Sequence, residues 1–316
     1  MKKSYFGLPL FYYLAFFLFA FLCVLFGSFF DYSLSKAFVS LNDPLGNFFE
    51  TMGQGIGYLT IPFGAVMVLK SLWKQGKKGF KIVGVVLFVI AVFMSVYTLG
   101  GAMNERTHIY GILFSPFVAY LVSVIINAFF LLIAFLIFRN EYSKEMAFVG
   151  LIFLLGCLFQ WLLIKLLKKI DCRPRFRYLI SDRNTNGEIF RSWWEMTPFR
   201  YSGDDHYSAP SGHTATFAQL LMLPTIAPFL KRRFKNDSFY YGVIGGVLTL
   251  LVMVMRIRVG AHFLSDVGGG LLVGSLLDFI LLLLFSIQPK KKKEEEQEAD
   301  KNKKVFSKKK EGNKTA

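Results

Sequence analysis

Cysteine and acidic residues are scarce in this sequence of 316 residues. Cys23 and Cys157 lie inside apolar stretches, Cys172 lies beside a polar segment, and no two cysteines have CxxC spacing. The sequence therefore predicts neither a disulfide framework nor a thiolate metal site. Acidic residues number 21 against 37 basic ones, and no carboxylate cluster suited to Mg²⁺ accompanies the polar motifs described below. We expect no metal and no other cofactor.

The basic surplus, a formal net charge of +16, would indicate nucleic-acid binding in a soluble chain. Here the lysines and arginines gather in short loops and in the C-terminal tail, which is typical of the cytoplasmic side of a membrane protein. We therefore expect the bilayer, and not nucleic acid, as a partner of this chain. The sequence does not indicate an oligomeric state.

Long polar stretches are rare before the tail, because 54% of the residues are hydrophobic and 17% are aromatic. The apolar runs are long enough to cross a bilayer, so we predict an all-α polytopic transmembrane bundle. The first run has no small-residue cleavage site before Asp31 and is expected to be a retained transmembrane helix. In the fourth run, Pro116 predicts a tilt or a kink. About eight spans are expected, over residues 8–30, 55–72, 80–100, 110–138, 147–167, 212–230, 239–257 and 265–287.

Loop charge predicts that both termini are cytoplasmic. Residues 1–145 are expected to form N-terminal transmembrane helices, with a surface helix near 41–54, and residues 146–288 a core that carries the polar motifs. Residues 289–316 contain eleven lysines against six acidic residues and almost no apolar ones, so we expect a disordered basic cytoplasmic tail. This topology puts three polar segments on the opposite, non-cytoplasmic face of the membrane.

The most informative polar segment is RIRVGAHFLSD, between the last two predicted spans. A charge at a membrane boundary is costly unless it is paired or hydrated, so it marks a functional candidate. His262 and Asp266 are four residues apart, which on a helix puts both on one face and lets the carboxylate hold an imidazole N–H. Arg256 would reach the same point from the preceding helix. The trio indicates an anion site with a nucleophile.

A second polar segment, APSGHT, opens the sixth predicted span. Ser211 is a natural helix N-cap, and the N–H groups of Gly212 and His213 would be donors at the positive end of a helix, which binds phosphate. His213 would lie beside the bound anion, where protonation is favoured and the ring can donate a proton to a leaving oxygen. The third segment, KLLKKIDCRPRFR, ends the fifth predicted span. On its own, this basic segment would indicate side chains snorkelling at a helix end.

These residues resemble the type 2 phosphatidic acid phosphatase superfamily, whose motifs run Lys-x6-Arg-Pro, Pro-Ser-Gly-His and Ser-Arg-x5-His-x3-Asp. Residues 210–213 match the second motif in full. Arg256, His262 and Asp266 match the third with identical spacing, although Met255 stands where the family usually has Ser. The ordered combination is specific, whereas Pro-Ser-Gly-His alone would be weak.

The first motif is matched less closely. Lys168 and Arg175 have the required six residues between them, but Phe176 replaces Pro. Arg173 is followed by Pro, yet Lys165 is one residue out of register with it. We prefer Lys168 with Arg175 and keep Arg173 as a secondary phosphate contact.

The resemblance implies a membrane phosphatase that works without metal. His262 would attack phosphorus to form a phosphohistidine, Asp266 would fix its tautomer, and His213 would protonate the leaving group. The phosphate-binding residues would be Lys168, Arg175, Ser211, Gly212 and Arg256. His206, with Asp204 and Asp205 nearby, could also be read as a metal site, but a solvated loop is the favoured interpretation.

The expected substrate is a phosphorylated lipid, met at headgroup level on the non-cytoplasmic face of a bacterial plasma membrane. Undecaprenyl diphosphate suits that face, and phosphatidylglycerophosphate and phosphatidic acid remain open. Two alternatives use the same residues. A lipid phosphotransferase would pass the phosphoryl group from the histidine to an acceptor other than water, and a transporter or scaffold would only bind anionic lipid.

Overall fold

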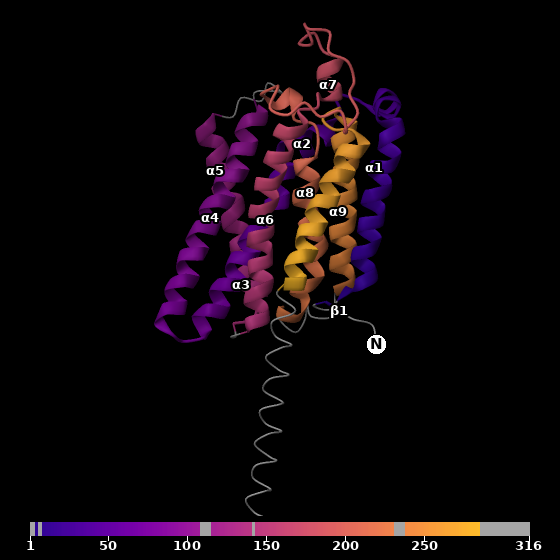
Figure 1. The fold of residues 1–316 in the computed structure, drawn as a ribbon. Helices are drawn as coiled ribbons and strands as arrows, with labels where there is room; N and C mark the ends of the chain where they lie inside the picture. Colours follow the sequence, from indigo (N-terminus) through magenta and orange to yellow (C-terminus); the bar gives the residue numbers. More distant parts are fainter. Residues whose placement is uncertain (1–3, 6–7, 108–114, 141–142, 231–237, 285–316) are drawn as a thin grey trace, which may run out of the picture.

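The computed structural model describes residues 4–5, 8–107, 115–140, 143–230 and 238–284. Long helices with similar axis directions form a bundle, and the segment that contains α7 covers one end of it (Figure 1). The described elements are β1 (Ser4–Tyr5), β2 (Leu8–Pro9), α1 (Leu10–Phe38), α2 (Pro44–Tyr58), α3 (Thr60–Lys74), α4 (Lys78–Thr107), α5 (Pro116–Ile137), α6 (Lys144–Asp171), α7 (Phe176–Leu179), η1 (Asp204–His206), α8 (Gly212–Ala218), η2 (Gln219–Phe229), α9 (Ser238–Arg258) and a last helix, Leu264–Leu284.

The predicted helical bundle is confirmed. In the described part of the chain, seven helical segments are long and apolar enough to cross a membrane. The expected span at 212–230 is not among them, because it is the short helix α8 followed by the 3-10 helix η2. Pro224 and Pro228 lie inside η2 and cannot donate the backbone hydrogen bonds of a continuous α-helix. The chain termini and the tail lie outside the described residues, so their cytoplasmic location stays a prediction.

Of the tilt or kink expected at Pro116, the kink is wrong and the tilt stays a prediction. Pro116 is the first residue of α5, and the side chain of Ser115 caps the helix by accepting a hydrogen bond from the Val118 N–H. Proline is favoured at this position because it has no N–H to leave unpaired. Residues 110–114 of the predicted span lie outside the described residues.

A helix is present where the sequence predicts one near 41–54. This helix, α2, begins after Asp43, whose carboxylate accepts a hydrogen bond of 2.7 Å from the Gly46 N–H. That bond, helped by Arg258, holds the pKa of Asp43 below its ordinary value. α2 runs almost directly into α3 and packs against α4, α8 and α9. Its expected position along the membrane surface stays a prediction.

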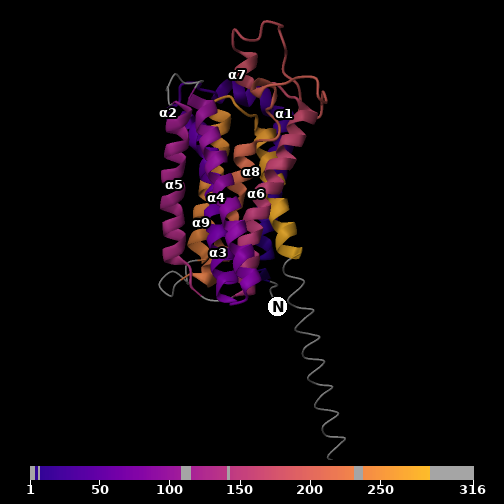
Figure 2. The ribbon, with the colours of Figure 1, turned by 90° about the vertical axis from the view of Figure 1, so that its left-hand side faces the viewer.

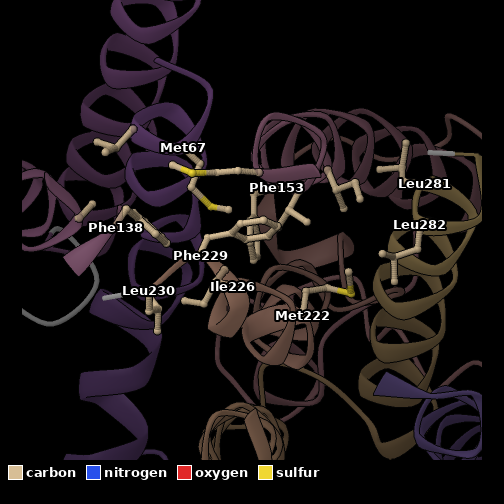
Figure 3. Packing of buried hydrophobic residues seen from close by; sticks show 14 of the residues in the cluster. Met67, Phe138, Phe153, Met222, Ile226, Phe229, Leu230, Leu281 and Leu282 are labelled. Carbon is tan, nitrogen blue, oxygen red and sulfur yellow. The ribbon is translucent and has the colours of Figure 1, made fainter. Parts of the chain in front are cut away.

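Two views at right angles agree that α7 and its flanking loops lie beyond one end of the long helices (Figure 2). The same end holds the last residues of α1 and α6. The largest apolar cluster joins α3, α6, η2 and the last helix, and Figure 3 shows Phe153, Met222 and Phe229 among the side chains that fill it. This packing fixes the helices from which the loops of the candidate site project.

Candidate active site

All three polar segments line a single cavity at the end of the bundle that carries α7. The cavity has a volume of about 360 Å³. The hollow lies between α2, α6, α8 and the loops that precede α8 and the last helix. Its lining residues are Tyr58, Gln160, Trp161, Ile164, Lys165, Lys168, Lys169, Arg175, Asp204, Tyr207, Gly212, His213, Ala215, Thr216 and His262.

Backbone hydrogen bonds between the segments hold this arrangement together. The Arg177 N–H donates to the carbonyl of Gly260 at 2.9 Å, and the Ser211 N–H donates to the carbonyl of Asp266 at 2.9 Å. The Ser208 N–H donates to the carbonyl of Arg173 at 3.1 Å. The three segments are thus joined pairwise, so the positions of their side chains depend on one another.

The last two turns of α6 supply lysines to the cavity. Lys165, Lys168 and Lys169 all line it, and Lys165 also lies 4.0 Å over the ring of Trp161. The C-cap of α6 is Cys172, which has left-handed backbone angles (φ 50°) and whose N–H donates to the carbonyl of Lys168. The reversal lets the basic segment fold back over the helix end.

Arg175 follows this turn and is fixed by three hydrogen bonds. Its Nε donates to the Asp204 carbonyl at 2.6 Å, and its guanidinium donates to the Asp204 carboxylate at 2.6 Å and to the Ala261 carbonyl at 3.3 Å. The side chain is 1% exposed but lines the cavity. Arg175 therefore presents a charge of fixed orientation to whatever anion enters.

His262 is held in one tautomer by the backbone. Its Nδ1 lies 2.6 Å from the carbonyl oxygen of Ser208, which can only accept a hydrogen bond, so Nδ1 carries the proton. Nε2 is then the nitrogen with a lone pair, and the ring lines the cavity. Burial lowers the pKa of His262 well below 6.5, and the positive charges of Arg175, Arg256 and Lys168 lower it further. The ring is therefore neutral at pH 7, as a nucleophile requires.

His213 lines the same cavity from the first turn of α8. Its Nε2 lies 3.2 Å from the backbone carbonyl of Glu50 and donates a hydrogen bond to it. Nδ1 is the ring nitrogen that this bond does not use, and it is the atom we assign to proton exchange with a ligand.

Asp266 has a different set of partners from the one its spacing suggests. Its carboxylate is 4.0 Å from Nδ1 of His262, which is ion-pair distance but too long for a hydrogen bond. It accepts instead from Arg173 at 2.6 Å, from the Ser208 hydroxyl at 2.5 Å and from the Phe263 N–H at 2.8 Å. The Ser208 carbonyl, and not Asp266, sets the tautomer.

Arg173 does not line the cavity. Its guanidinium donates to Asp31 at 2.9 Å and to Asp266 at 2.6 Å, and it lies 4.2 Å over the ring of Phe263. At 1% exposure it is a buried structural cation. The expected secondary phosphate contact from Arg173 is therefore not supported by its position.

Ser211 acts as the N-cap of α8, as expected. Its hydroxyl oxygen accepts hydrogen bonds from the N–H and the hydroxyl of Thr214, and the side chain is buried away from the cavity. Gly212, by contrast, lines the cavity directly. Of these two predicted phosphate contacts, the structure brings Gly212 to the cavity and leaves Ser211 behind it.

Arg256 is fully buried beside the cavity, and its guanidinium is 3.3 Å from the Glu50 carboxylate. Glu50 also accepts hydrogen bonds of 2.7 and 2.9 Å from Arg177. Sequence reasoning missed both Glu50 and Asp31, the partner of Arg173. The signal available in the sequence was an acidic residue next to an apolar stretch. Such a residue requires a buried partner for its charge.

In the part of the chain that the structure describes, no three metal-binding side chains come together around His206. His206 pairs with Glu188 at 3.0 Å and stacks on the ring of Tyr201, with centroids 4.4 Å apart. Asp204 is exposed, as expected of a solvated loop, but it also binds Arg175 and lines the cavity.

Comparison with known proteins supports the resemblance. Residues 145–290 match the model of the PAP2 superfamily, and this range contains all three motifs. Residues 145–290 form a PAP2 superfamily domain. The resemblance to type 2 phosphatidic acid phosphatases is thereby confirmed for this part of the chain, while Asp31 and Glu50 lie outside it.

Two curated relatives carry the name phosphatidylglycerophosphatase B. The protein from Bacillus subtilis (strain 168) is 33% identical over 108 residues, which is 32% of this chain and 51% of that protein. The protein from Haemophilus influenzae is 34% identical over 110 residues, which is 32% of this chain and 43% of that protein. The chain thus spans about half the length of these relatives or less. No solved structure gives a significant match.

Proposed function

We propose that this chain is an integral membrane phosphatase that removes phosphate from a lipid phosphate or diphosphate without metal. The observation that carries the proposal is the shared cavity. Two histidines, Lys168 and Arg175 line one hollow of about 360 Å³, and His262 is held there with Nδ1 protonated. A neutral imidazole surrounded by cations suits attack on an anionic phosphorus centre.

An apolar groove beside the cavity supports a lipid substrate. It has a volume of about 310 Å³ and shares Tyr58 and Trp161 with the cavity. A phosphate in the cavity would therefore have an apolar channel next to it for its hydrocarbon chain. The groove lies between α2, α3, α4 and α6, and its other lining residues are Ile61, Leu87, Ile90, Ala91, Met94, Thr98, Leu154, Leu155, Cys157 and Leu158.

The proposed reaction has two steps. Nε2 of His262 forms a bond to phosphorus while the bond from phosphorus to the lipid oxygen breaks. His213, in its imidazolium form, gives its Nδ1 proton to that oxygen. Water then attacks the phosphohistidine, the N–P bond breaks, inorganic phosphate leaves and His213 regains a proton. Lys168, Arg175 and the Gly212 N–H would neutralise the phosphoryl oxygens, where phosphoryl transfer gains most of its rate. Arg256, which does not line the cavity, would add its positive charge from behind the wall.

The names of the relatives favour phosphatidylglycerophosphate as the lipid. Undecaprenyl diphosphate and phosphatidic acid present the same phosphoryl chemistry, so a panel of lipids has to decide among them. We place the active site on the non-cytoplasmic face of the plasma membrane, because the basic loops that the positive-inside rule assigns to the cytoplasm join helices at the opposite end of the bundle (Figure 1).

Phosphate release by purified protein tests the proposal. In detergent micelles, the wild type should release inorganic phosphate from at least one of the three lipids, and His262→Ala should release none. His206→Ala is the matched control, because His206 is a buried histidine near the second motif that does not line the cavity. Unchanged turnover in His262→Ala would refute the proposed phosphatase reaction.

Product analysis separates the rivals. A phosphotransferase would return less than one phosphate per lipid consumed and would label an added alcohol, whereas hydrolysis gives full yield. A transporter or scaffold would bind the lipid and release no phosphate in any variant.

A further inference from the structure

We propose that Glu50, on α2, is a positioning residue for the phosphatase reaction, through its carboxylate on Arg256 and its carbonyl on His213. The inference rests on the proposed function and deepens it. Glu50 lies outside residues 145–290, so it also gives the N-terminal helices a part in assembling the site.

α2 is packed closely enough against the motif segments to act in this way. A Cβ added to Gly53 would lie 3.3 Å from Cδ2 of His213. A Cβ added to Gly57 would lie 2.6 Å from the hydroxyl of Thr216, which no side chain tolerates without movement. Glycine at these two positions therefore lets the backbone of α2 come within hydrogen-bond reach of His213 on α8.

The Glu50 carboxylate joins cations from two different segments. It accepts hydrogen bonds of 2.7 and 2.9 Å from Arg177, which follows the first motif, and it is 3.3 Å from Arg256 of the third. Glu50 is 1% exposed and Arg256 is fully buried. A buried carboxylate between two guanidinium groups both neutralises them and fixes where each of them lies.

The backbone of the same residue fixes the proton donor. The Glu50 carbonyl accepts from Nε2 of His213, which directs Nδ1 to be the atom that exchanges the catalytic proton. Glu50 therefore fixes both the position of Arg256 behind the nucleophile and the ring nitrogen from which His213 gives its proton. Misplacement of such groups by about 1 Å can cost about 100-fold in rate.

The test compares Glu50→Gln with Arg177→Gln in the full chain. The amide keeps the size of Glu50 and its backbone carbonyl but removes the charge that holds Arg256. Arg177→Gln breaks the same buried pair from the other side and leaves Glu50 beside Arg256. We measure kcat and KM for the preferred lipid of the panel, together with thermal unfolding in detergent, which reports the folded fraction.

For Glu50→Gln we expect kcat per folded molecule to fall by about tenfold or more, with KM unchanged or lower because the site gains positive charge. Arg177→Gln should keep kcat within about threefold of the wild type, because Glu50 stays beside Arg256 and the reacting groups move only slightly. A kcat of Glu50→Gln within about threefold of the wild type would overturn the proposal. Equal losses of kcat in both variants would also overturn it, because they would show that Glu50 only stabilises the fold of the segment that carries Arg177.

Two further outcomes keep the inference separate from the proposed function. Where Glu50→Gln does not fold, Glu50→Asp takes its place, since the shorter side chain keeps the charge but withdraws it from Arg256. Wild-type kcat in Glu50→Asp would overturn the positioning role. A wild type that releases no phosphate from any lipid would overturn the proposed function itself, whereas an active wild type with an equally active Glu50→Gln would remove only Glu50.

Discussion

The role of Asp266 can be decided by replacing it with Asn. In the spacing argument, Asp266 holds the imidazole N–H of His262 directly. In the structure the Ser208 carbonyl does so at 2.6 Å, while Asp266 lies at 4.0 Å and binds Arg173, the Ser208 hydroxyl and the Phe263 N–H. Asp266→Asn keeps the size of the side chain and removes its charge, so it separates the two accounts.

The two accounts predict different losses. Where a carboxylate sets the tautomer itself, its amide variant loses about 10⁴ in kcat. Here the tautomer survives, and the loss comes from the missing charge beside a developing imidazolium. Two unit charges 4 Å apart at an effective dielectric constant of 20 interact by about 4 kcal/mol, or about 10³ in rate. Arg173, 2.6 Å from the same carboxylate, cancels part of that field, so we expect about 100-fold.

The assay is steady-state phosphate release with thermal unfolding measured in parallel. Asp266→Asn should also lower the unfolding temperature, because Arg173 is buried and loses one of its two carboxylates. A loss of about 10⁴ with unchanged thermal stability would refute the reasoning, since it would be the result expected of a direct tautomer contact. A loss of kcat smaller than about threefold would also refute the reasoning, because it would show that the charge of Asp266 does not stabilise the imidazolium of His262.

Four further results are expected. The lowered pKa of His262 leaves the ring neutral above pH 6.5, so the acid limb of kcat/KM, corrected for titration of the substrate phosphate, should lie below pH 6.5, and a limb above that value would contradict this assignment. EDTA should leave phosphate release unchanged. A loss of phosphate release in EDTA would show that a metal takes part. A cysteine introduced at the exposed Asn186 should react with an impermeant reagent in intact cells, whereas protection would reverse the orientation. Asp31→Asn should lower the unfolding temperature, at a cost of up to about 3 kcal/mol, while the exposed Asp182→Asn should not.

The helical bundle could be predicted because hydropathy is a local property of the sequence. Runs of about 20 apolar residues predict spans without knowledge of their neighbours. The expected span at 212–230 shows the limit, since Pro224 and Pro228 were present in the sequence yet hydropathy alone does not register their missing N–H groups. Pro116 shows the opposite error, because a proline that starts a helix was read as one that bends it.

The meeting of the histidines could be predicted from motif order and loop charge, and both rings do line one cavity. The hydrogen-bond partners of Asp266 and Arg173 could not. A spacing of four residues puts His262 and Asp266 on one face, but which group each side chain contacts depends on neighbours far away in the sequence. Glu50 and Asp31 lie more than 100 residues from their arginines, and nothing local in the sequence names those pairs.

The balance of charge at the site follows from these long-range pairs. The sequence predicts Lys168, Arg175 and Arg256 as the cations that bind the phosphate. In the structure the four buried arginines of the network, Arg173, Arg175, Arg177 and Arg256, meet four carboxylates, those of Asp31, Glu50, Asp204 and Asp266.

The arginine and carboxylate charges of this network therefore cancel, and the surplus positive charge in the cavity comes from the three lysines of α6 that line it. An entering phosphate must also compete with Asp204 for Arg175, because the two side chains are only 2.6 Å apart. Since the Asp204 side chain is 48% exposed, its carboxylate can turn to water as the phosphate arrives, and binding then exchanges one anion on Arg175 for another. Arg175 would thus gain its full effect on the phosphoryl group only after the substrate has displaced a carboxylate of the protein itself.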